Sequence, residues 1–201
     1  MVTIPSLPKP LTWGEDPVSW SYEDGKLKLE AGPTTDLFVD PGNAYQTVNA
    51  PRLITTIDGD FQLSAKVSVG FSASYDAGTL LLWVNGSTWA KLCFEYSPHG
   101  QPMIVSVVTQ GTSDDANGFT VEGRGVWLRV SRLGRAYAYH ASTDSKYWHL
   151  VRHFTFGDAE VDGGGASVGF EAQSPMGPGV QATFSDIRLI PERLQDLRDG
   201  H

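Results

Sequence analysis

The segment Ser87-Thr-Trp-Ala-Lys-Leu-Cys-Phe-Glu-Tyr96 decides the fold class, because its side chains alternate in character as they do along a β-strand. One set suits a hydrophobic core: Ala90, Leu92, Phe94 and Tyr96. The other set places an aromatic ring, a base, a thiol and an acid on the opposite face: Trp89, Lys91, Cys93 and Glu95. This second face is either a binding surface or a salt-bridged outer face of a sheet.

Turn signals extend this strand into an antiparallel pattern. Asn85-Gly86 is a strong hairpin signal that joins 79–84 to 87–96, and Leu133-Gly134 joins 126–132 to 135–140. Further strand-like segments lie at 20–22, 26–31, 35–38, 52–57, 61–69, 102–110, 148–154, 167–172 and 181–191. So many short strands between turns predict an all-β, two-sheet antiparallel sandwich. The pattern predicts one short helix at most, at the C-terminal 191–198, where a proline stands in the first turn.

Length and charge bound the class of protein. The 201 residues predict one domain spanning 1–201, with its core at about 11–190. A net charge of -8 argues against nucleic acid and against an anionic membrane surface as partners. The first 15 residues lack the pattern of a signal peptide, and no window approaches the ~18 apolar residues of a membrane span. We therefore expect a soluble, cytoplasmic protein, whose oligomeric state the sequence does not define.

Cys93 is the single cysteine, so an internal disulfide is excluded. We expect a small buried residue at this position, because a catalytic thiol would need a neighbouring histidine. His99 stands in a separate Ser-Pro-His-Gly turn and cannot be placed beside Cys93 from the sequence.

A series of motifs runs through almost the whole chain, from about Leu11 to Ile190. It consists of Trp13…Trp20, Thr35-Asp-Leu-Phe38, Asp60-Phe-Gln-Leu-Ser-Ala65, Tyr75-Asp-Ala-Gly78, Trp89-Ala-Lys-Leu-Cys-Phe-Glu95, Val107-Val-Thr109, Leu128-Arg-Val130, Asp144-Ser-Lys-Tyr-Trp148 and Val168-Gly-Phe-Glu-Ala-Gln-Ser-Pro175. This series resembles a family of uncharacterised domains with a concanavalin-A-like jelly-roll sandwich, whose fungal members carry the label "regulation of enolase". The chain departs from that family after the Val-Val-Thr strand, where 113–117 replaces a segment that often contains tryptophan.

The resemblance implies a lectin/glucanase-type sandwich, in which ligands cross the concave sheet. Outward-facing side chains of that sheet are therefore the candidate ligand-binding residues: Trp83, Trp89, Lys91, Glu95, Arg129, Tyr139, Glu171 and Gln173. Rim or neighbouring positions add Asp36, Tyr75 and Asp76. Aromatic rings that stack on a sugar, together with forked donors and carboxylates for its hydroxyls, favour a carbohydrate or polar metabolite as ligand.

Three alternatives remain open for this face. Lys91, Glu95, Arg129 and Glu171 could form a structural ion-pair network across neighbouring strands instead of, or as well as, a ligand site. A glycoside-active enzyme would use Glu95 as its catalytic carboxylate, paired with Glu171 or Asp36; the chain lacks the Glu-x-Asp-x-x-Glu strand of glucanases on this fold, so binding without catalysis is favoured. A protein-interaction or regulatory module is the third alternative, and it would need an exposed apolar patch.

Metal ligands are weakly indicated. His149 and His153 would lie about 13 Å apart along a strand, which is too far for one zinc ion, and we expect the histidines at the surface or in loops. The acidic segment 113–117 and Asp36…Asp40 keep calcium open as an alternative, although a solvated turn at 113–117 is favoured. The expectation is therefore no metal and no cofactor.

Two further turns are predicted. At Tyr75-Asp-Ala-Gly78, Asp76 would bond backbone amides and Gly78 would take a positive φ, unless the segment forms the rim of the ligand groove. The run Asp162-Gly-Gly-Gly165 indicates a loop before a core strand.

Overall fold

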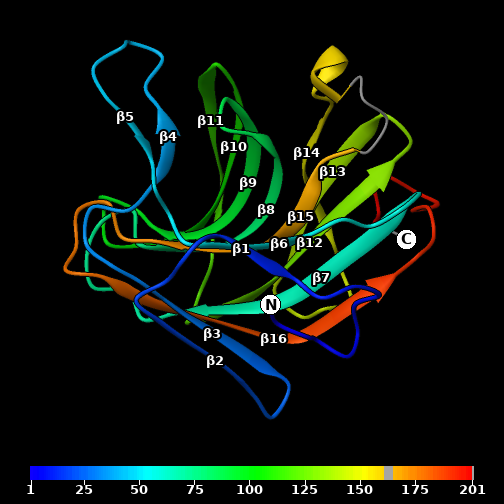
Figure 1. The fold of residues 1–201 in the computed structure, drawn as a ribbon, viewed down its shortest axis with the longest axis horizontal. Coiled ribbons are helices and arrows are strands. Elements are labelled where there is room, and N and C mark those ends of the chain that lie inside the picture. The colour runs from blue at the N-terminus through cyan, green and yellow to red at the C-terminus, as the bar shows by residue number, and fades with distance from the viewer. Residues whose placement is uncertain (161–164, 201) are drawn as a thin grey trace.

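The computed structural model describes residues 1–160 and 165–200 and confirms the all-β jelly-roll sandwich, with two large sheets facing each other (Figure 1). Every strand pairing in this part of the chain is antiparallel. The first sheet has seven strands in the order β1 (Thr12–Glu15), β6 (Arg52–Thr55), β15 (Ser167–Gln173), β8 (Ala77–Asn85), β9 (Thr88–Tyr96), β10 (Pro102–Gln110) and β11 (Thr112–Thr120).

The second sheet packs against the first. It also has seven strands among the described residues, in the order β14 (His149–Phe154), β13 (Ala136–Ser142), β12 (Gly125–Leu133), β7 (Phe61–Val69), β16 (Val180–Ile190), β3 (Lys26–Ala31) and β2 (Ser19–Glu23). A separate hairpin pairs β4 (Leu37–Val39) with β5 (Gln46–Val48), and one 3-10 turn spans Gly157–Glu160.

The main core lies between the two sheets. From the first sheet it contains Ala90, Leu92 and Phe94 of β9, as the alternation in the sequence predicted. From the second sheet it contains Val126, Leu128 and Val130 of β12, also as predicted. The two predicted hairpins are present, β8–β9 around Asn85-Gly86 and β12–β13 around Leu133-Gly134, and Gly134 takes the positive φ that such a tight turn needs.

A second, smaller apolar cluster lies on the outer face of the first sheet. Leu37 and Ala50, at the two ends of the β4–β5 segment, pack there against Leu81 of β8 and Trp89 of β9. The β4–β5 hairpin stands beside the strands β8–β11 in Figure 1. It therefore covers part of a face that the sequence predicted to be open.

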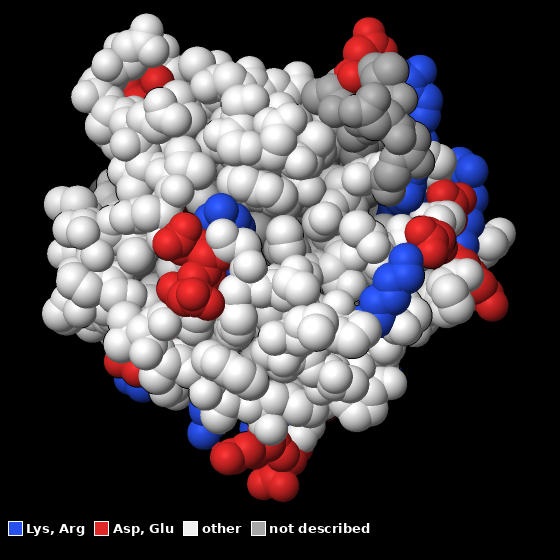
Figure 2. Space-filling view, in the orientation of Figure 1, with Lys and Arg blue, Asp and Glu red and all other residues white. Residues whose placement is uncertain are grey.

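Charged side chains are unevenly placed on the surface. On the face drawn in Figure 2 they gather in a few groups, with broad uncharged areas between them. The net charge of -8 is therefore not displayed as one continuous acidic surface on this face. Within the described residues, no helix reaches the length and apolar character that a membrane crossing requires.

The predicted C-terminal helix is wrong. Residues 191–200 form turns instead, and Leu194 is buried. Side chains of the second sheet bind carbonyls of this segment: His140 Nε2 donates to Leu197 O at 2.9 Å and Arg129 Nη2 donates to Gly200 O at 2.6 Å. Contacts with the sheet thus replace the internal hydrogen bonds of a short, weakly stable helix.

Three strands were missed by the sequence patterns: β1, β5 and β11. The last of these replaces the solvated turn that we expected at 113–117, and residues 112–120 pair with β10 along most of their length. The predicted glycine-rich loop at 162–165 and the predicted surface position of His201 cannot be compared with the fold, because 162–164 and His201 lie outside the described residues.

A close approach of two strands at Gly169 gives the first testable prediction. A Cβ at this position of β15 would fall inside the contact radius of the Leu53 carbonyl oxygen on β6. We therefore expect Gly169→Ala to lower the free energy of unfolding by about 3 kcal/mol or more, measured by urea denaturation, because the backbone of β6 cannot move aside easily.

Gly86→Ala is the matched control, since a Cβ there meets no atom within 4 Å. It should change stability by less than about 1 kcal/mol. Equal stability of the two variants would contradict the tight β6–β15 packing.

Candidate functional site

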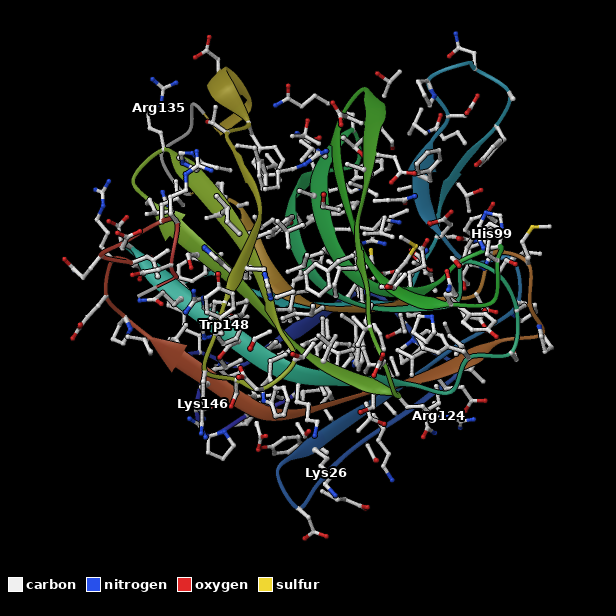
Figure 3. The ribbon with its side chains drawn as sticks, turned by 180° about the vertical axis from the view of Figure 1, so that it is seen from behind. Lys26, His99, Arg124, Arg135, Lys146 and Trp148 are labelled. Carbon is white, nitrogen blue, oxygen red and sulfur yellow. The ribbon has the colours of Figure 1, made fainter. Side chains whose placement is uncertain are left out.

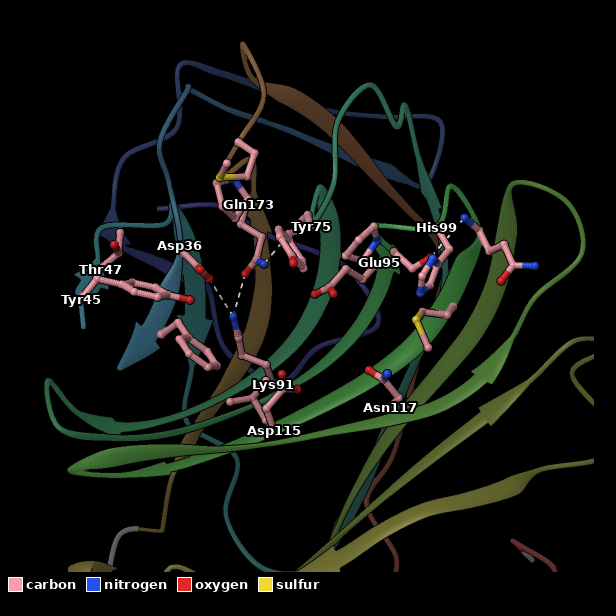
Figure 4. Close-up of a pocket in the computed structure, with 18 of the residues that line it drawn as sticks. Asp36, Tyr45, Thr47, Tyr75, Lys91, Glu95, His99, Asp115, Asn117 and Gln173 are labelled. Carbon is pink, nitrogen blue, oxygen red and sulfur yellow. Dashed lines mark hydrogen bonds and ion pairs between the residues drawn. The ribbon is translucent and has the colours of Figure 1, made fainter. Parts of the chain in front are cut away.

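A buried lysine organises the outer face of the first sheet. Lys91 is 2% exposed, and its Nζ donates to Asp36 Oδ1 at 3.0 Å and to Gln173 Oε1 at 2.7 Å (Figure 4). The amide Nε2 of Gln173 donates in turn to the carbonyl of Tyr75 at 3.2 Å. This chain of polar contacts joins four segments: β9, the residue before β4, the end of β15 and the turn before β8.

The buried lysine stays charged. Burial on its own lowers the pKa of Lys91, but the neighbouring carboxylates, first among them Asp36, outweigh this effect and hold the pKa above its ordinary value. The side chain of Asp36 is 13% exposed, so the ion pair is largely shielded from water.

A pocket of about 820 Å³ opens beside this polar centre, and we call it the concave pocket. The strands curve around it in Figure 4. The hairpin segment and β9 contribute Asp36, Phe38, Tyr45, Thr47, Lys91 and Glu95; β10, β11 and β15 contribute Met103, Val107, Asp115, Asn117, Thr120 and Gln173; turns contribute Thr34, Tyr75, Ser97, Pro98, His99, Gln101, Pro175 and Met176. The pocket therefore combines carboxylates, amides and aromatic rings.

Glu95 enters the pocket from β9 with its carboxyl group unpaired. The described residues offer it no hydrogen bond and no ion pair, although the residue is mostly buried. Burial raises the pKa of Glu95 from 4.5 to about 8; Lys91 opposes the rise, while carboxylates including Asp115 and Asp36 add to it. A carboxyl that changes its charge near neutral pH can act as a proton donor or as a hydrogen-bond acceptor.

The turn before β8 presents an aromatic ring at the pocket. Tyr75 has φ +70°, an unfavourable conformation for a bulky residue, and it is 41% exposed. The buried carboxylate of Asp76 fixes this turn: it accepts hydrogen bonds from the amides of Ser72 and Ala73 at 2.8 and 2.9 Å and from Ser174 Oγ at 2.6 Å.

Asp76 thus has the turn role that the sequence favoured, and it does not line the pocket. The expected positive φ at Gly78 is wrong, because Tyr75 adopts it instead. Close packing, rather than backbone conformation, requires glycine at position 78, since a Cβ there would lie 2.8 Å from the Val67 side chain.

Glu171 lies under the same face but outside the pocket. It is fully buried on β15, beside Arg52 of β6 and Thr79 of β8 in the strand register. Among the described residues neither of its carboxyl oxygens has a hydrogen-bond partner. Burial raises the pKa of Glu171 from 4.5 to about 7, against the opposing charge of Lys91.

The two tryptophans among the predicted ligand-binding residues pack against other side chains of the protein. Trp83 and Trp89 stack on each other at 5.6 Å, and Arg52 lies 4.2 Å above the ring of Trp83. Trp89 is fully buried beneath Leu37 and Ala50. Neither tryptophan lines the concave pocket.

The prediction that Arg129 and Tyr139 share this face is wrong. Both belong to the second sheet, on β12 and β13. Tyr139 points into the main core, because the outward positions of β13 are the small or polar Ala138 and His140. Arg129 does point outward, but from the opposite side of the sandwich, where it stacks over Trp148 at 4.2 Å.

Figure 3 places Trp148 well away from His99 at the pocket. The predicted ion-pair network therefore does not include Arg129, and the partner of Lys91 is Asp36 rather than Glu95 or Glu171.

The sequence missed the residues that the hairpin and β11 bring to the pocket: Phe38, Tyr45, Thr47, Asp115 and Asn117. One signal was available. Ser113, Asp115 and Asn117 alternate along 112–120, as polar residues do on one face of a strand. His99, which could not be placed from the sequence, also lines the pocket.

Metal and thiol chemistry gain no support from the geometry. Within residues 1–160 and 165–200, no three His, Cys, Asp or Glu side chains converge in a way that could hold a metal ion. That the protein binds no metal stays a prediction. Cys93 is buried as expected, and burial raises the pKa of its thiol. The expectation of surface histidines is wrong for His140, which is fully buried under 191–200, whereas His149 and His153 are exposed.

The ion pair of Lys91 gives the second prediction. Lys91→Met would leave the Asp36 carboxylate and the Gln173 amide without their partner, so we expect a loss of about 3 kcal/mol in the free energy of unfolding. The double variant Lys91→Met/Asp36→Asn should regain part of this loss. Lys26→Met, at an exposed lysine of β3, is the control and should stay within about 0.5 kcal/mol of the wild type. A single-variant loss as small as that of the control would refute the role of the pair.

The buried Glu171 gives the third. A carboxyl whose pKa is raised by folding stabilises the fold at low pH, and this stabilisation is lost as the pH rises from about 4.5 through about 7. Glu171→Gln removes the charge, so at pH 8 it should be more stable than the wild type by up to about 3 kcal/mol and at pH 4 nearly equal. Urea denaturation at the two pH values measures this. An identical pH dependence in both proteins would show that Glu171 titrates normally.

Comparison with known proteins places the chain in a family. Residues 13–192 match the family described as "Protein of unknown function (DUF1349)". "Regulation of enolase protein 1" of Saccharomyces cerevisiae is 28% identical over 189 residues, which make up 94% of this chain and 93% of that protein. A solved structure of a functionally unknown protein from Saccharomyces cerevisiae matches with a TM-score of 0.81 at 27% identity, covering 90% of this chain and 96% of that one.

More distant structures share the fold alone. A variant of the GH43 protein BlXynB from Bacillus licheniformis has a TM-score of 0.73 at 20% identity, and xylan beta-1,4-xylosidase from Bacillus halodurans has 0.71 at 15%. Each match covers 90% of this chain but only 36% and 37% of those longer proteins. The family match over 13–192, together with the retained fold, assigns this chain to the family of proteins of unknown function named DUF1349.

Proposed function

We propose that the concave pocket binds a small polar ligand, in the first place a carbohydrate, without catalysing its conversion. The observation that carries this proposal is the pocket of about 820 Å³, whose wall is fixed by the buried Lys91 with its partners Asp36 and Gln173. This volume lies within the range of roughly 300–1,000 Å³ that is usual for small-molecule sites.

The lining suits a sugar. Tyr45 and Tyr75 are 56% and 41% exposed, so their rings are available to stack on the apolar face of a pyranose. Glu95, Asp115 and Asn117 offer acceptors and donors for hydroxyl groups.

The likeness to GH43 proteins and to a xylan beta-1,4-xylosidase agrees with a carbohydrate, but it rests on the fold alone. The chain corresponds to little more than a third of those proteins, so their activity is not transferred to it.

A glycoside-active enzyme is the second candidate, and Glu95 favours it. Its raised pKa of about 8 would keep the carboxyl group largely protonated at neutral pH, as a general acid requires. Turnover lost in Glu95→Gln while binding is retained would establish catalysis.

A regulatory role, as the name of the yeast relative implies, would make the pocket a sensor site or would use another surface. Trp20 of β2 and Ile190 of β16 are large apolar side chains of the second sheet that are exposed and could contribute to such a surface.

The test is thermal unfolding with a panel of mono- and oligosaccharides and phosphorylated sugars, with and without calcium. A ligand present at 100 times its dissociation constant adds about 2.7 kcal/mol to stability, which is a readily measured shift. We expect a hit that weakens at least tenfold in Glu95→Gln, because the carboxyl group faces the pocket. The exposed Glu23 of β2 supplies the control, since Glu23→Gln should bind as the wild type does. A hit unaffected by Glu95→Gln, or none in the whole panel, would refute the proposal.

A further inference from the structure

We propose that the concave pocket holds a chain of two or more linked sugar units rather than a single sugar; this inference rests on the proposed function. The argument starts from the length of the pocket along β9. Lys91 and Glu95 both line the pocket and stand four residues apart on one face of this strand, which corresponds to about 13 Å. A single pyranose ring is shorter than this span, whereas linked units can reach both ends.

The neighbouring strands have the same two ends. Lys91 stands opposite Val107 of β10, and Val107 stands opposite Asp115 of β11. Farther along β9, Glu95 stands opposite Met103 of β10. All five residues line the pocket, so it extends along the strands and not only across them. We call the end beside Lys91 and Asp115 the hairpin end, and the end beside Glu95 and Met103 the turn end.

The floor between the two ends is apolar. Phe38 and Met103 both line the pocket, and both pack on a buried cluster that includes Cys93, Val105 and Val107. Polar side chains therefore stand at the ends and hydrocarbon lies between them. This arrangement suits a saccharide chain, whose rings present C–H faces to an apolar surface while their hydroxyl groups reach hydrogen-bonding partners.

Contacts with β11 hold the hairpin end in place. The backbone amide of Val39 in β4 donates to Ser113 Oγ of β11 at 2.9 Å, which ties the hairpin to the strand that carries Asp115. The ring of Tyr45 stacks on Phe38 with centroids 5.8 Å apart. Tyr45 is thereby fixed as an exposed ring at this end of the pocket.

A tight turn forms the other end. The amide of Gly100 donates to the Ser97 carbonyl at 2.9 Å, and the amide of Gln101 donates to Ser97 Oγ at 3.2 Å. This turn places His99 at the pocket, and Figure 4 shows His99 and Tyr45 on opposite sides of Lys91. Because separate contacts fix the two ends, each can hold one unit of the same chain, and the second unit adds affinity without a second binding event.

A series of chain lengths tests the inference. The probes are β-1,4-linked xylose, β-1,4-linked glucose and α-1,4-linked glucose, each from one to four units, and their dissociation constants are measured by ligand-observed NMR at pH 7. In at least one series we expect three units to bind at least about tenfold tighter than one unit, which corresponds to about 1.4 kcal/mol.

Variants at the two ends show whether the longer chain reaches both. Tyr45→Ala at the hairpin end and His99→Ala at the turn end should each weaken binding of the three-unit chain about fivefold, because each removes a ring that lines the pocket. The matched controls are Tyr147→Ala and His153→Ala, at exposed residues outside this pocket, and they should bind the chain as the wild type does.

The outcomes separate the two proposals. Equal affinity for one and three units in every series that binds would overturn the inference and leave the polar-ligand function standing. Extra affinity of the longer chain that survives both Tyr45→Ala and His99→Ala would also overturn it, because the added units would then bind outside the two ends. Failure of every probe to bind at millimolar concentration would count against both proposals.

Discussion

The buried charge of Lys91 is the constraint on which the candidate site depends. A lysine that is 2% exposed is tolerated only if its ammonium group is paired and hydrogen-bonded, because an unpaired buried charge is destabilising by several kcal/mol. Asp36 and Gln173 meet that requirement by accepting hydrogen bonds from Lys91 Nζ. The amide of Gln173 also donates to the Tyr75 carbonyl, which ties the turn before β8 to the same centre. Segments far apart in sequence are thereby held around one pocket. The same contacts keep the β4–β5 hairpin against the first sheet, since Asp36 directly precedes β4.

That hairpin divides the outer face of the first sheet into two parts with different properties. Over one part, Leu37 and Ala50 cover Trp89 and Leu81, so the face becomes a small second core. Over the other part, Phe38 and Tyr45 form a wall of the concave pocket instead of a cover. Trp83 and Trp89, which the sequence suggested as sugar-binding residues, therefore pack beneath the hairpin. Tyr45 of the hairpin is the aromatic residue that is exposed at the pocket.

Alternation along 87–96 was enough to predict both faces of β9, because burial of one face of a strand leaves a period of two. The turn signals at Asn85-Gly86 and Leu133-Gly134 predicted the two hairpins, and the many short strands between turns predicted the sandwich class. The same pattern cannot say which sheet a strand joins. Arg129 was therefore given to the wrong side of the sandwich, although its outward direction was predicted correctly. Residues 112–120 have polar side chains on a strand at the edge of the sheet, so they lack the hydrophobic signal of a strand. The segment 191–198 has a helical pattern, but His140 and Arg129 bind carbonyls near its end.

If the concave pocket is the ligand site, backbone-amide chemical-shift mapping will locate the ligand there when a sugar that raises the thermal stability is titrated into the isotope-labelled protein. We expect the perturbed amides in β9, β10 and β11, in the turn around Tyr75 and in the β4–β5 hairpin, with those of β12 and β13 unchanged. Perturbations concentrated on the outer face of the second sheet, around Arg129 and Trp148, would show that the ligand binds elsewhere.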